Sequence, residues 1–238
     1  MRRFYKEAAV SAEAEGFAVT LDGKTVRTPE GTKLVLPTQP LAEAVAGEWL
    51  AQEETIKPHT MPLTQLASTA LDRMGPKRGP VVDHIVSYAD TDLLCYRATS
   101  PGDLVERQTR LWQPILDGLT AKLGVEIEYT AAITPITQPA VTKDTLRRHV
   151  EALDDWTLTA LQAAVAALGS LYLGLALADG LLSSEEAFAA SNLDETYQIE
   201  FWGDDDDAIG RREVLRNDVS SAGLFIELCL RVDPPMQS

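Results

Sequence analysis

The stretch from Leu158 to Leu177 constrains the fold more than any other segment, because it is apolar on every side of the helix that it predicts. A helix of this kind must be buried, either in a helical bundle or in a membrane. The stretch also carries Gly169 and Gly174. Each glycine costs about 1 kcal/mol relative to alanine in a helix, so these positions predict a neighbouring helix that approaches closely.

The membrane alternative fits the flanks of this stretch poorly, although its length would suffice to span a bilayer. Thr159 and Gln162 interrupt it with polar side chains, and Asp155 and Asp179 lie at its two ends. A membrane span is typically flanked by Lys, Arg and aromatic residues instead. The sequence therefore predicts a helix buried in a bundle, with no membrane insertion.

The N-terminal part of the chain has the pattern of β-strands. Residues 17–21 alternate large apolar side chains with smaller ones, and Asp22-Gly23 follows. This dipeptide favours a two-residue hairpin turn, because both positions accept positive φ. A return strand from Val26 and a third strand at 34–36 complete a small antiparallel meander. Such a sheet has no stable core alone, so the next helix, with Thr38 as its N-cap, is expected to cover it.

The glycine- and proline-rich segment Gly75–Pro80 predicts a hinge or domain boundary. The pattern beyond it is mostly helical, interrupted by short extended pieces at 93–97, 125–129 and 133–141. The predicted fold class is α+β: a small N-terminal β-rich domain (1–75), an antiparallel meander plus helix, followed by a larger mostly α-helical domain (76–238). Helices are expected at residues 38–49, 63–73, 81–89, 104–123, 142–153, 158–177, 183–202 and 205–231.

The charge balance limits the partners of this protein. The 36 acidic and 21 basic residues give a net charge of −15. A surface this negative repels phosphate backbones and anionic lipid headgroups, so nucleic-acid binding is not expected. Cationic or mixed-charge protein surfaces are the natural partners, although acidity also serves solubility. The two cysteines, Cys95 and Cys229, lie in apolar contexts typical of packed thiols in a reducing compartment.

No catalytic motif accompanies the three histidines, His59, His84 and His149. We therefore expect no enzyme activity, no cofactor and no metal. A small-molecule hydrolase built on His59 and nearby carboxylates is the catalytic alternative. The run Asp204–Asp207 offers oxygen ligands to a divalent cation, but it lacks the alternating spacing of a calcium loop. Complementing the dipole of the next helix is the better interpretation of these aspartates.

Residues 191–212 form the segment with the clearest functional pattern, because aromatic rings run directly into dense charge. Aromatic side chains bury much area for little entropy and suit a surface that recognises another macromolecule. At helical spacing, Glu195 lies beside Gln198 and one turn before Trp202. An exposed helix glutamate without function is the alternative. Trp49 is interpreted as structural packing.

The chain as a whole resembles the ATP synthase assembly chaperones of the ATP-twelve family, which attend the alpha subunit of the catalytic head. The resemblance runs through most of the chain in the family's order, and its combination of blocks is specific. Ser68 stands where the family usually has asparagine. The blocks that carry it are FAVTLDGKTVRTPEGTKLVLPT, EWLAQEETIKPHTMPLTQLASTALD, YADTDLLCYRA, LVERQTRLWQPIL, ITPITQP, LGSLYLGLAL and LDETYQIEFWGDDDDA.

The resemblance implies a chaperone without catalysis, which binds the unassembled alpha subunit, prevents its aggregation and hands it on for assembly with the beta subunit. The functionally important glutamate of the family's Leu-Asp-Glu block matches Glu195. Asp194, Tyr197, Gln198 and Trp202 are expected to support it as partner-binding surface.

By the same resemblance, we expect a monomer in the bacterial cytoplasm, with eukaryotic relatives in the mitochondrial matrix. The resemblance implies no cofactor. The alternative function is an acidic scaffold that binds another basic or mixed-charge protein.

Overall fold

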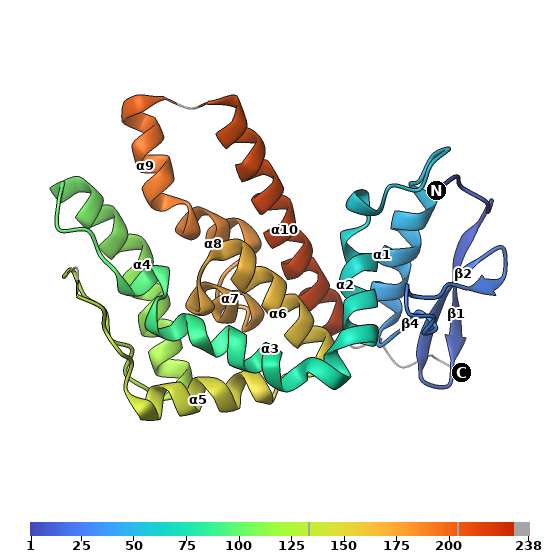
Figure 1. Ribbon diagram of the computed structural model, residues 1–238, viewed down its shortest axis with the longest axis horizontal. Helices are drawn as coiled ribbons and strands as arrows, with labels where there is room; N and C mark the ends of the chain where they lie inside the picture. The colour runs from blue at the N-terminus through green and yellow to red at the C-terminus, as the bar shows by residue number, and fades with distance from the viewer. Residues whose placement is uncertain (133, 204, 231–238) are drawn as a thin grey trace, which may run out of the picture. The chain divides into compact units, whose positions relative to one another are not determined.

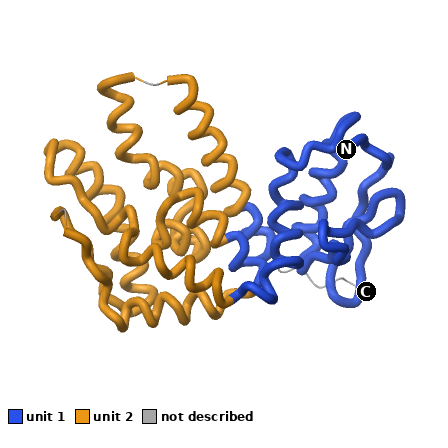
Figure 2. The backbone as a smooth tube through the Cα atoms, viewed as in Figure 1, with its two compact units in different colours: residues 1–78, 155–160, 224–238 blue, residues 79–154, 161–223 orange. Residues whose placement is uncertain are grey.

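The computed structural model describes residues 1–132, 134–203 and 205–230. The chain divides into two compact units (Figure 2): unit 1 comprises Met1–Arg78, Asp155–Ala160 and Leu224–Ser238, and unit 2 comprises Gly79–Asp154 and Leu161–Gly223. Unit 1 thus joins the N-terminal sheet to two segments from much later in the chain. The division into domains at residues 1–75 and 76–238 stays a prediction.

Unit 1 contains one antiparallel sheet in which β2 pairs with every other strand. β1 pairs with β2 along the whole length of β2. β3 and β4 therefore share the other edge of β2: β3 pairs with Thr20–Leu21, and β4 pairs with Phe17–Ala18. The predicted hairpin turn is confirmed, with φ of 46° at Asp22 and 77° at Gly23. The sequence pattern did not reveal β1. The strands are β1 (Ala8–Glu13), β2 (Gly16–Leu21), β3 (Lys24–Thr25) and β4 (Val35–Leu36).

Helix α1 (Gln39–Leu50) packs on this sheet, as predicted. Thr38 is its N-cap, and Oγ1 of Thr38 accepts a hydrogen bond from the backbone nitrogen of Leu41 at 3.4 Å. Leu41, Ala42 and Val45 are fully buried. The α+β fold class is confirmed.

The remaining helices follow the sheet and α1 along the chain (Figure 1). They are η1 (Pro58–Thr60), α2 (Pro62–Thr69), η2 (Ala70–Met74), α3 (Gly75–Ser87), η3 (Tyr88–Asp90), η4 (Leu93–Cys95), α4 (Gly102–Leu123), α5 (Ala140–Glu151), α6 (Asp155–Leu168), α7 (Leu171–Ala178), α8 (Ser184–Ser191), α9 (Leu193–Trp202) and α10 (Asp206–Leu230). Among the described residues no helix is both long enough and apolar enough to cross a membrane.

The segment Gly75–Pro80, predicted as a hinge or domain boundary, is not an irregular hinge, because its residues form the start of α3. The division between the two units does fall within it, between Arg78 and Gly79. α2, the π-helical turn η2 and α3 follow one another without a break. Pro76 and Pro80 are both exposed. Each proline removes one backbone donor, and on an exposed face water can satisfy the carbonyl that loses its partner.

The predicted single helix over 158–177 is also wrong, because it is two helices, α6 and α7. Gly169 adopts a φ of 64°, which a residue with a side chain rarely accepts. Ser170 then caps α7, and its Oγ accepts from the backbone nitrogen of Leu173 at 3.0 Å. Gly174 meets the expectation of close packing, since a Cβ there would lie 2.5 Å from Cγ2 of Val165 on α6.

Other elements also differ from the predictions. The helix expected over 183–202 is interrupted at Asn192, giving α8 and α9. The extended pieces at 93–97 and 125–129 contribute only η4 and an isolated bridge between Tyr96 and Thr130. The predictions for Ile133 and Arg231 lie outside the described residues.

The break between α6 and α7 is held by a buried carboxylate, Asp92, which is 0% exposed. Its Oδ1 accepts from Oγ of Ser170 at 2.7 Å and from the nitrogen of Leu94 at 3.1 Å. Its Oδ2 accepts from the nitrogen of Tyr172 at 3.2 Å. Burial raises the pKa of Asp92 to about 6 against the opposing effect of these hydrogen bonds. Asp92 thereby joins the segment before η4 to the first turn of α7.

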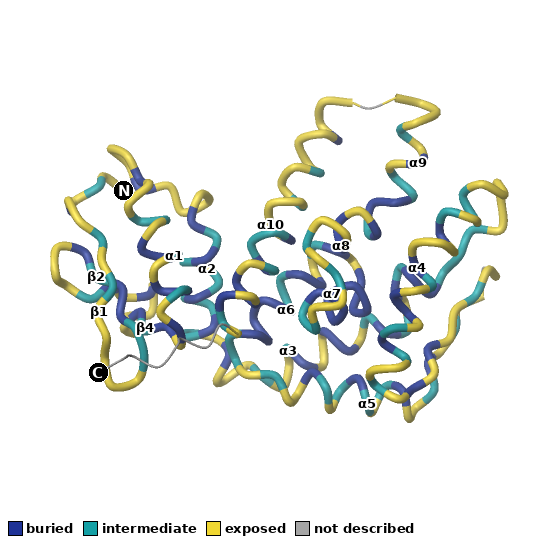
Figure 3. The backbone as a smooth tube through the Cα atoms, turned by 180° about the vertical axis from the view of Figure 1, so that it is seen from behind, coloured by how far each residue is buried: buried dark blue, intermediate teal, exposed yellow. Residues whose placement is uncertain are grey.

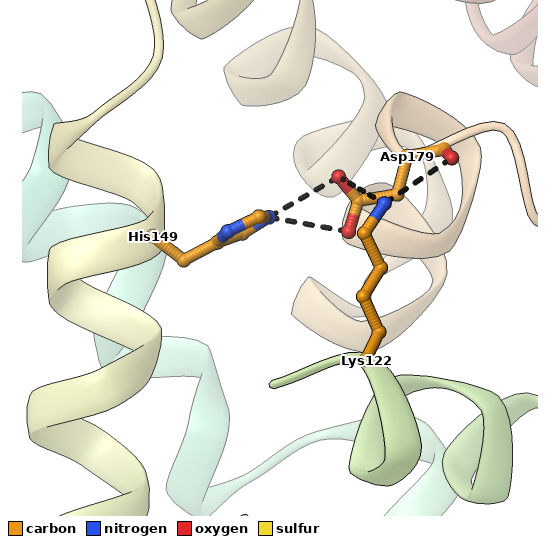
Figure 4. A network of polar contacts seen from close by, with 3 residues as sticks. All are labelled: Lys122, His149 and Asp179. Atoms are coloured by element: carbon orange, nitrogen blue, oxygen red, sulfur yellow. Dashed lines mark hydrogen bonds and ion pairs between the residues drawn. The ribbon is translucent and has the colours of Figure 1, made fainter. Parts of the chain in front are cut away.

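A second polar network joins α4, α5 and α7 at the surface of unit 2 (Figure 4). Nε2 of His149 lies 3.2 Å from each carboxylate oxygen of Asp179, and Nζ of Lys122 lies 3.2 Å from Oδ1. Burial by itself would raise the pKa of Asp179, but the contacts with His149 and Lys122 outweigh it and hold this pKa below its ordinary value. The carboxylate thus gains stability from both partners.

Asp179→Asn is expected to lower the free energy of unfolding by about 1–3 kcal/mol, because Lys122 loses its counterion and His149 loses a carboxylate acceptor. The matched control is Asp83→Asn, which removes the exposed ion pair with Arg147 and should cost less than about 1 kcal/mol. Denaturant titrations of both variants measure the difference. The contribution of Asp179 should be present above the unfolded carboxylate pKa of about 3.9 and lost as the pH falls through the lower folded value. Equal costs for the two variants would contradict this account.

Candidate functional site

The candidate site lies on α9, the helix with the aromatic and acidic pattern. α9 begins after Asn192 and ends at Gly203, whose φ of 80° terminates the helix. The chain then enters α10 at Asp206, so α9 and α10 are consecutive helices (Figure 1). Figure 3 shows that the C-terminal end of α9 and the N-terminal end of α10 are exposed, while the N-terminal end of α9 is more buried.

The five residues predicted to bind a partner separate onto two faces of α9. Glu195, Gln198 and Trp202 are spaced three and four residues apart and therefore share one face. Gln198 and Trp202 are exposed, and the side chain of Glu195 is 43% exposed. Asp194 and Tyr197 lie on a different face.

This second face of α9 holds the helix against α4. Nε2 of Gln108 donates to Oδ1 of Asp194 at 2.8 Å, and the hydroxyl of Tyr197 donates to the carboxylate of Asp103 at 2.9 Å. Burial and the hydrogen bond to Asp103 raise the pKa of Tyr197. Nη1 of Arg107 also contacts Oε1 of Glu200 at 2.7 Å. Asp194 and Tyr197 are thus placed to position α9, with Glu195, Gln198 and Trp202 left accessible.

Glu195 is the carboxylate of the exposed face, and it pairs with α10. Its Oε1 lies 3.3 Å from Nη1 of Arg212, whose side chain is 19% exposed. The pair orients the glutamate and leaves part of its carboxylate open to solvent. A partner's cationic group can therefore reach Glu195 without the helix unfolding.

Exposed apolar side chains lie at the end of α9 and on the following helix, α10. Trp202 is 79% exposed and Phe201 is 60% exposed. α10 adds Ile209 and Val214, which are 40% and 60% exposed. The sequence analysis did not single out these two, although an apolar residue within a charged helical stretch is the signal that could have found them. The rings of Phe201 and Trp202 lie 6.4 Å apart, and large apolar side chains exposed together in this way indicate a surface for another macromolecule.

The aspartate run after α9 begins α10. Asp204 lies outside the described residues. Oδ1 of Asp205 accepts from the nitrogen of Ala208 at 2.8 Å, and Asp206 and Asp207 lie in the first turn. This confirms the interpretation that these three aspartates complement the dipole at the N-terminus of α10. In the described part of the chain, no group of three or more His, Cys, Asp or Glu side chains is arranged to hold a metal ion.

Two other residues considered in the sequence analysis, His59 and Trp49, lie outside the candidate site on α9. His59 is exposed on η1, and in the described ranges no hydrogen bond or ion pair joins it to a carboxylate. Trp49 lies on α1 with its ring 5.7 Å from that of Tyr5, whose hydroxyl donates to the backbone oxygen of Trp49 at 2.7 Å. Trp49 is half-buried and its ring lines a pocket of unit 1. Its structural role stays a prediction.

Comparison with known proteins gives one consistent result. Residues 2–120 match the family model described as ATP12 chaperone protein. "Protein atp12, mitochondrial" of Schizosaccharomyces pombe is 30% identical over 94% of this chain and 81% of its own length. "Protein ATP12, mitochondrial" of Saccharomyces cerevisiae is 21% identical over 90% of this chain and 81% of its own length.

The solved structures agree with these matches. The crystal structure of Atp12 from Paracoccus denitrificans is 37% identical, covers 96% of this chain and 98% of that one, and has a TM-score of 0.91. The family match covers half of the chain and the fission yeast relative matches nearly all of it. The chain therefore belongs to the ATP12 (ATP-twelve) chaperone family of ATP synthase assembly chaperones.

Proposed function

We propose that this protein binds the unassembled alpha subunit of the ATP synthase catalytic head, prevents its aggregation and hands it on for assembly with the beta subunit. The observation that carries the proposal is the exposed face of α9. It presents a 79%-exposed tryptophan, Trp202, on the same face as the partly open carboxylate of Glu195. An orphan subunit exposes an apolar and partly charged interface, and this face is complementary to such a surface.

The division of α9 into two faces supports reversible binding. Asp194 and Tyr197 hold the helix to α4, so binding needs little rearrangement of the backbone. The acidic net charge of −15 speeds the encounter with a positively charged patch more than it tightens the complex. Binding of this kind suits a chaperone that must release its client. We assign no catalytic step to the protein, and we place it in the compartment where the subunits assemble, the bacterial cytoplasm.

The experiment mixes the protein with isolated alpha subunit and follows light scattering. We expect wild type to suppress aggregation at near-equimolar ratio. Glu195→Lys is expected to need at least tenfold more protein for the same effect, because reversing the charge replaces attraction by repulsion at a desolvated contact, at a cost of about 1.4 kcal/mol or more.

Glu200→Lys is the matched control for this variant. It lies on the same helix, is also ion-paired and makes the same change of charge, but its partner is Arg107 on α4. Suppression by Glu200→Lys should remain close to wild type. If both lysine variants keep full activity, the client surface lies away from α9. If wild type itself fails to suppress aggregation but captures another basic protein, the scaffold alternative replaces the chaperone proposal.

A further inference from the structure

Strand β1 forms a free edge of the sheet in unit 1. All six of its residues pair with β2, and among the described residues no strand pairs with its other side. β3 and β4, on the opposite side of β2, are two residues long each. Proteins commonly protect an edge strand with charged side chains, proline or a bulge. β1 has no proline, and its one charged residue is the last, Glu13. The edge is therefore open to another strand.

The register of β1 shows which of its backbone groups are unpaired. The nitrogen of Asp22 donates to the oxygen of Glu7 at 3.1 Å, and these two residues lie opposite each other in the register of the two strands. In an antiparallel pair, residues that exchange hydrogen bonds alternate with residues that do not. Ala8, Val10 and Ala12 therefore direct their N–H and C=O groups away from β2. Within the described ranges no hydrogen bond reaches these groups.

A groove of about 420 Å³ lies beside this edge and is lined by both β1 and α1. From α1 it takes Gln39, Glu43 and Ala46, which are spaced four and three residues apart and share one face of the helix. The β1 residues that line it are alanines and one valine, whose small side chains leave the groove unfilled. A strand added to β1 would extend the sheet beside α1 and direct every second side chain toward this groove.

The groove carries a negative charge near one end of β1. Glu43 is the one charged residue among the described residues that line it. Its carboxylate is exposed and accepts from Nε2 of Gln39 at 2.7 Å, and in the described part of the chain no Lys or Arg pairs with it. The hydroxyl of Tyr5, just before β1, donates to the backbone oxygen of Trp49 near the end of α1. β1 and α1 thus run in opposite directions, and Glu43 lies toward the C-terminal half of β1.

We propose that the β1 edge and its groove bind an extended polypeptide segment of a partner protein, which adds a strand to the sheet. The segment presents apolar side chains and a Lys or Arg at alternate positions, with the cation beside Glu43. A polypeptide is favoured over a small molecule because the unpaired groups of β1 recur at every second residue, a spacing that an extended backbone matches. A second copy of this chain is disfavoured, because its own β1 would bring only small side chains and two chains of net charge −15 repel each other.

The test titrates the full-length protein with capped heptapeptides on a threonine background. The first carries Lys, Leu and Val at its second, fourth and sixth positions, an order that brings lysine to Glu43 when the peptide runs antiparallel to β1. We expect it to bind roughly fivefold more tightly than a peptide with Glu for Lys, and roughly tenfold more tightly than one with Ser for Leu and Val. Binding should also slow hydrogen exchange at the amides of Ala8, Val10 and Ala12.

Two N-methylated forms of the Lys-Leu-Val peptide separate strand addition from contact through side chains alone. In an added strand, the N–H groups of alternate residues face β1. Methylation of the set that faces β1 should weaken binding roughly tenfold or more, whereas methylation of the other set should change it less than about threefold. Equal affinity of the two forms would exclude strand addition.

Val10→Pro tests the edge from the side of the protein. Proline removes an N–H that β2 does not use, which edge strands tolerate, and binding should weaken roughly tenfold. Val10→Thr is the matched control, because it keeps the donor and a branched side chain, and it should bind the peptide like wild type. Melting curves check that each variant is folded.

Glu43→Lys tests the charge of the groove. The preference should reverse, so that the Glu peptide binds more tightly than the Lys peptide. Glu53→Lys makes the same change of charge at an exposed residue of unit 1 outside the groove, and it should keep the preference of wild type. Glu195→Lys should also bind like wild type, because α9 belongs to unit 2. Failure of this proposal is thus distinguishable from failure of the α9 proposal.

Several outcomes would overturn the proposal. Equal affinity for the three unmethylated peptides, or no binding by any, would exclude the stated chemistry. If the amides of Ala8, Val10 and Ala12 become protected with rising protein concentration and no peptide, a second copy of the chain is the occupant. If the peptides bind only to a chain that ends at Leu230, the protein's own residues 231–238 are the competing occupant in place of a partner.

Discussion

Asp92→Ala is expected to lower the free energy of unfolding by about 3 kcal/mol, a large part of the 5–15 kcal/mol that stabilises a typical protein. The variant removes the acceptor of three hydrogen bonds, from Ser170, Leu94 and Tyr172. Each donor left unsatisfied in the interior costs about 1–3 kcal/mol. The variant also no longer buries a charged carboxylate, and the absence of this desolvation cost offsets part of the loss. For a chain of this length the melting temperature should fall by roughly 6–12 °C.

Asp92→Asn is the matched control for the charge. It keeps one acceptor oxygen and the shape of the side chain, so its cost at neutral pH should be well below that of the alanine variant. Near-equal melting temperatures of wild type and Asp92→Ala would show that the three donors find other acceptors, and would remove Asp92 from its structural role.

The pH dependence of Asp92 has a defined sign. Its folded pKa of about 6 lies above the ordinary aspartate value, because burial disfavours the charged form. The folded state therefore binds the proton more tightly, and the penalty for the charge appears as the pH rises from about 4 to about 6. Wild type should lose on the order of 2 kcal/mol relative to Asp92→Asn over this interval, since each unit of pKa difference corresponds to about 1.4 kcal/mol. Denaturant titrations of both proteins at pH 4.5 and pH 7.5 measure it.

Trp202→Ala is expected to weaken alpha-subunit binding by roughly 30-fold, or about 2 kcal/mol, while leaving the fold intact. Its side chain is 79% exposed in the free protein, so its burial in a complex would remove much apolar area from water. Titration calorimetry with isolated alpha subunit gives the affinity, and light scattering gives the effect on aggregation.

Leu50→Ala is the control for exposed apolar area in general. Leu50 is 49% exposed on α1, which belongs to unit 1 and not to the unit that contains α9, and its truncation should change the affinity less than threefold. Unchanged affinity of Trp202→Ala would remove this tryptophan from the binding surface. An equal loss in both variants would indicate nonspecific apolar association.

The hairpin and the caps could be predicted because their causes are local. An Asp-Gly dipeptide between strands favours positive φ, which Asp22 and Gly23 adopt, and Thr38 caps the next helix through its own side chain. The capping box that Ser183 and Glu186 form at the start of α8 has the same local origin. The hydroxyl or carboxylate that satisfies the helix end lies within a few residues of it. The sequence around a helix end is then sufficient to predict its cap.

The α9 surface could be predicted only in part. The spacing placed Glu195, Gln198 and Trp202 on one face, as the structure has them. It did not show that Asp194 and Tyr197 contact α4, because their partners Gln108 and Asp103 are about 90 residues away in the chain. It also missed the uncovered apolar residues of α10, since amphipathic pattern alone does not tell which face a neighbour covers.

By itself, the sequence determined the fold class, the buried character of the 158–177 stretch and the hairpin, because composition, periodicity and turn chemistry act over short distances. The resemblance of its blocks indicated the family, which the comparison with known proteins shows. Tertiary structure decided that this stretch breaks at Gly169, because the carboxylate of Asp92 lies at the first turn of α7 and binds Ser170. It also decided that Gly75–Pro80 is helical and that α1 and the edge strand β1 line one groove. Contacts between residues far apart in the chain decide such features, and no local pattern records them.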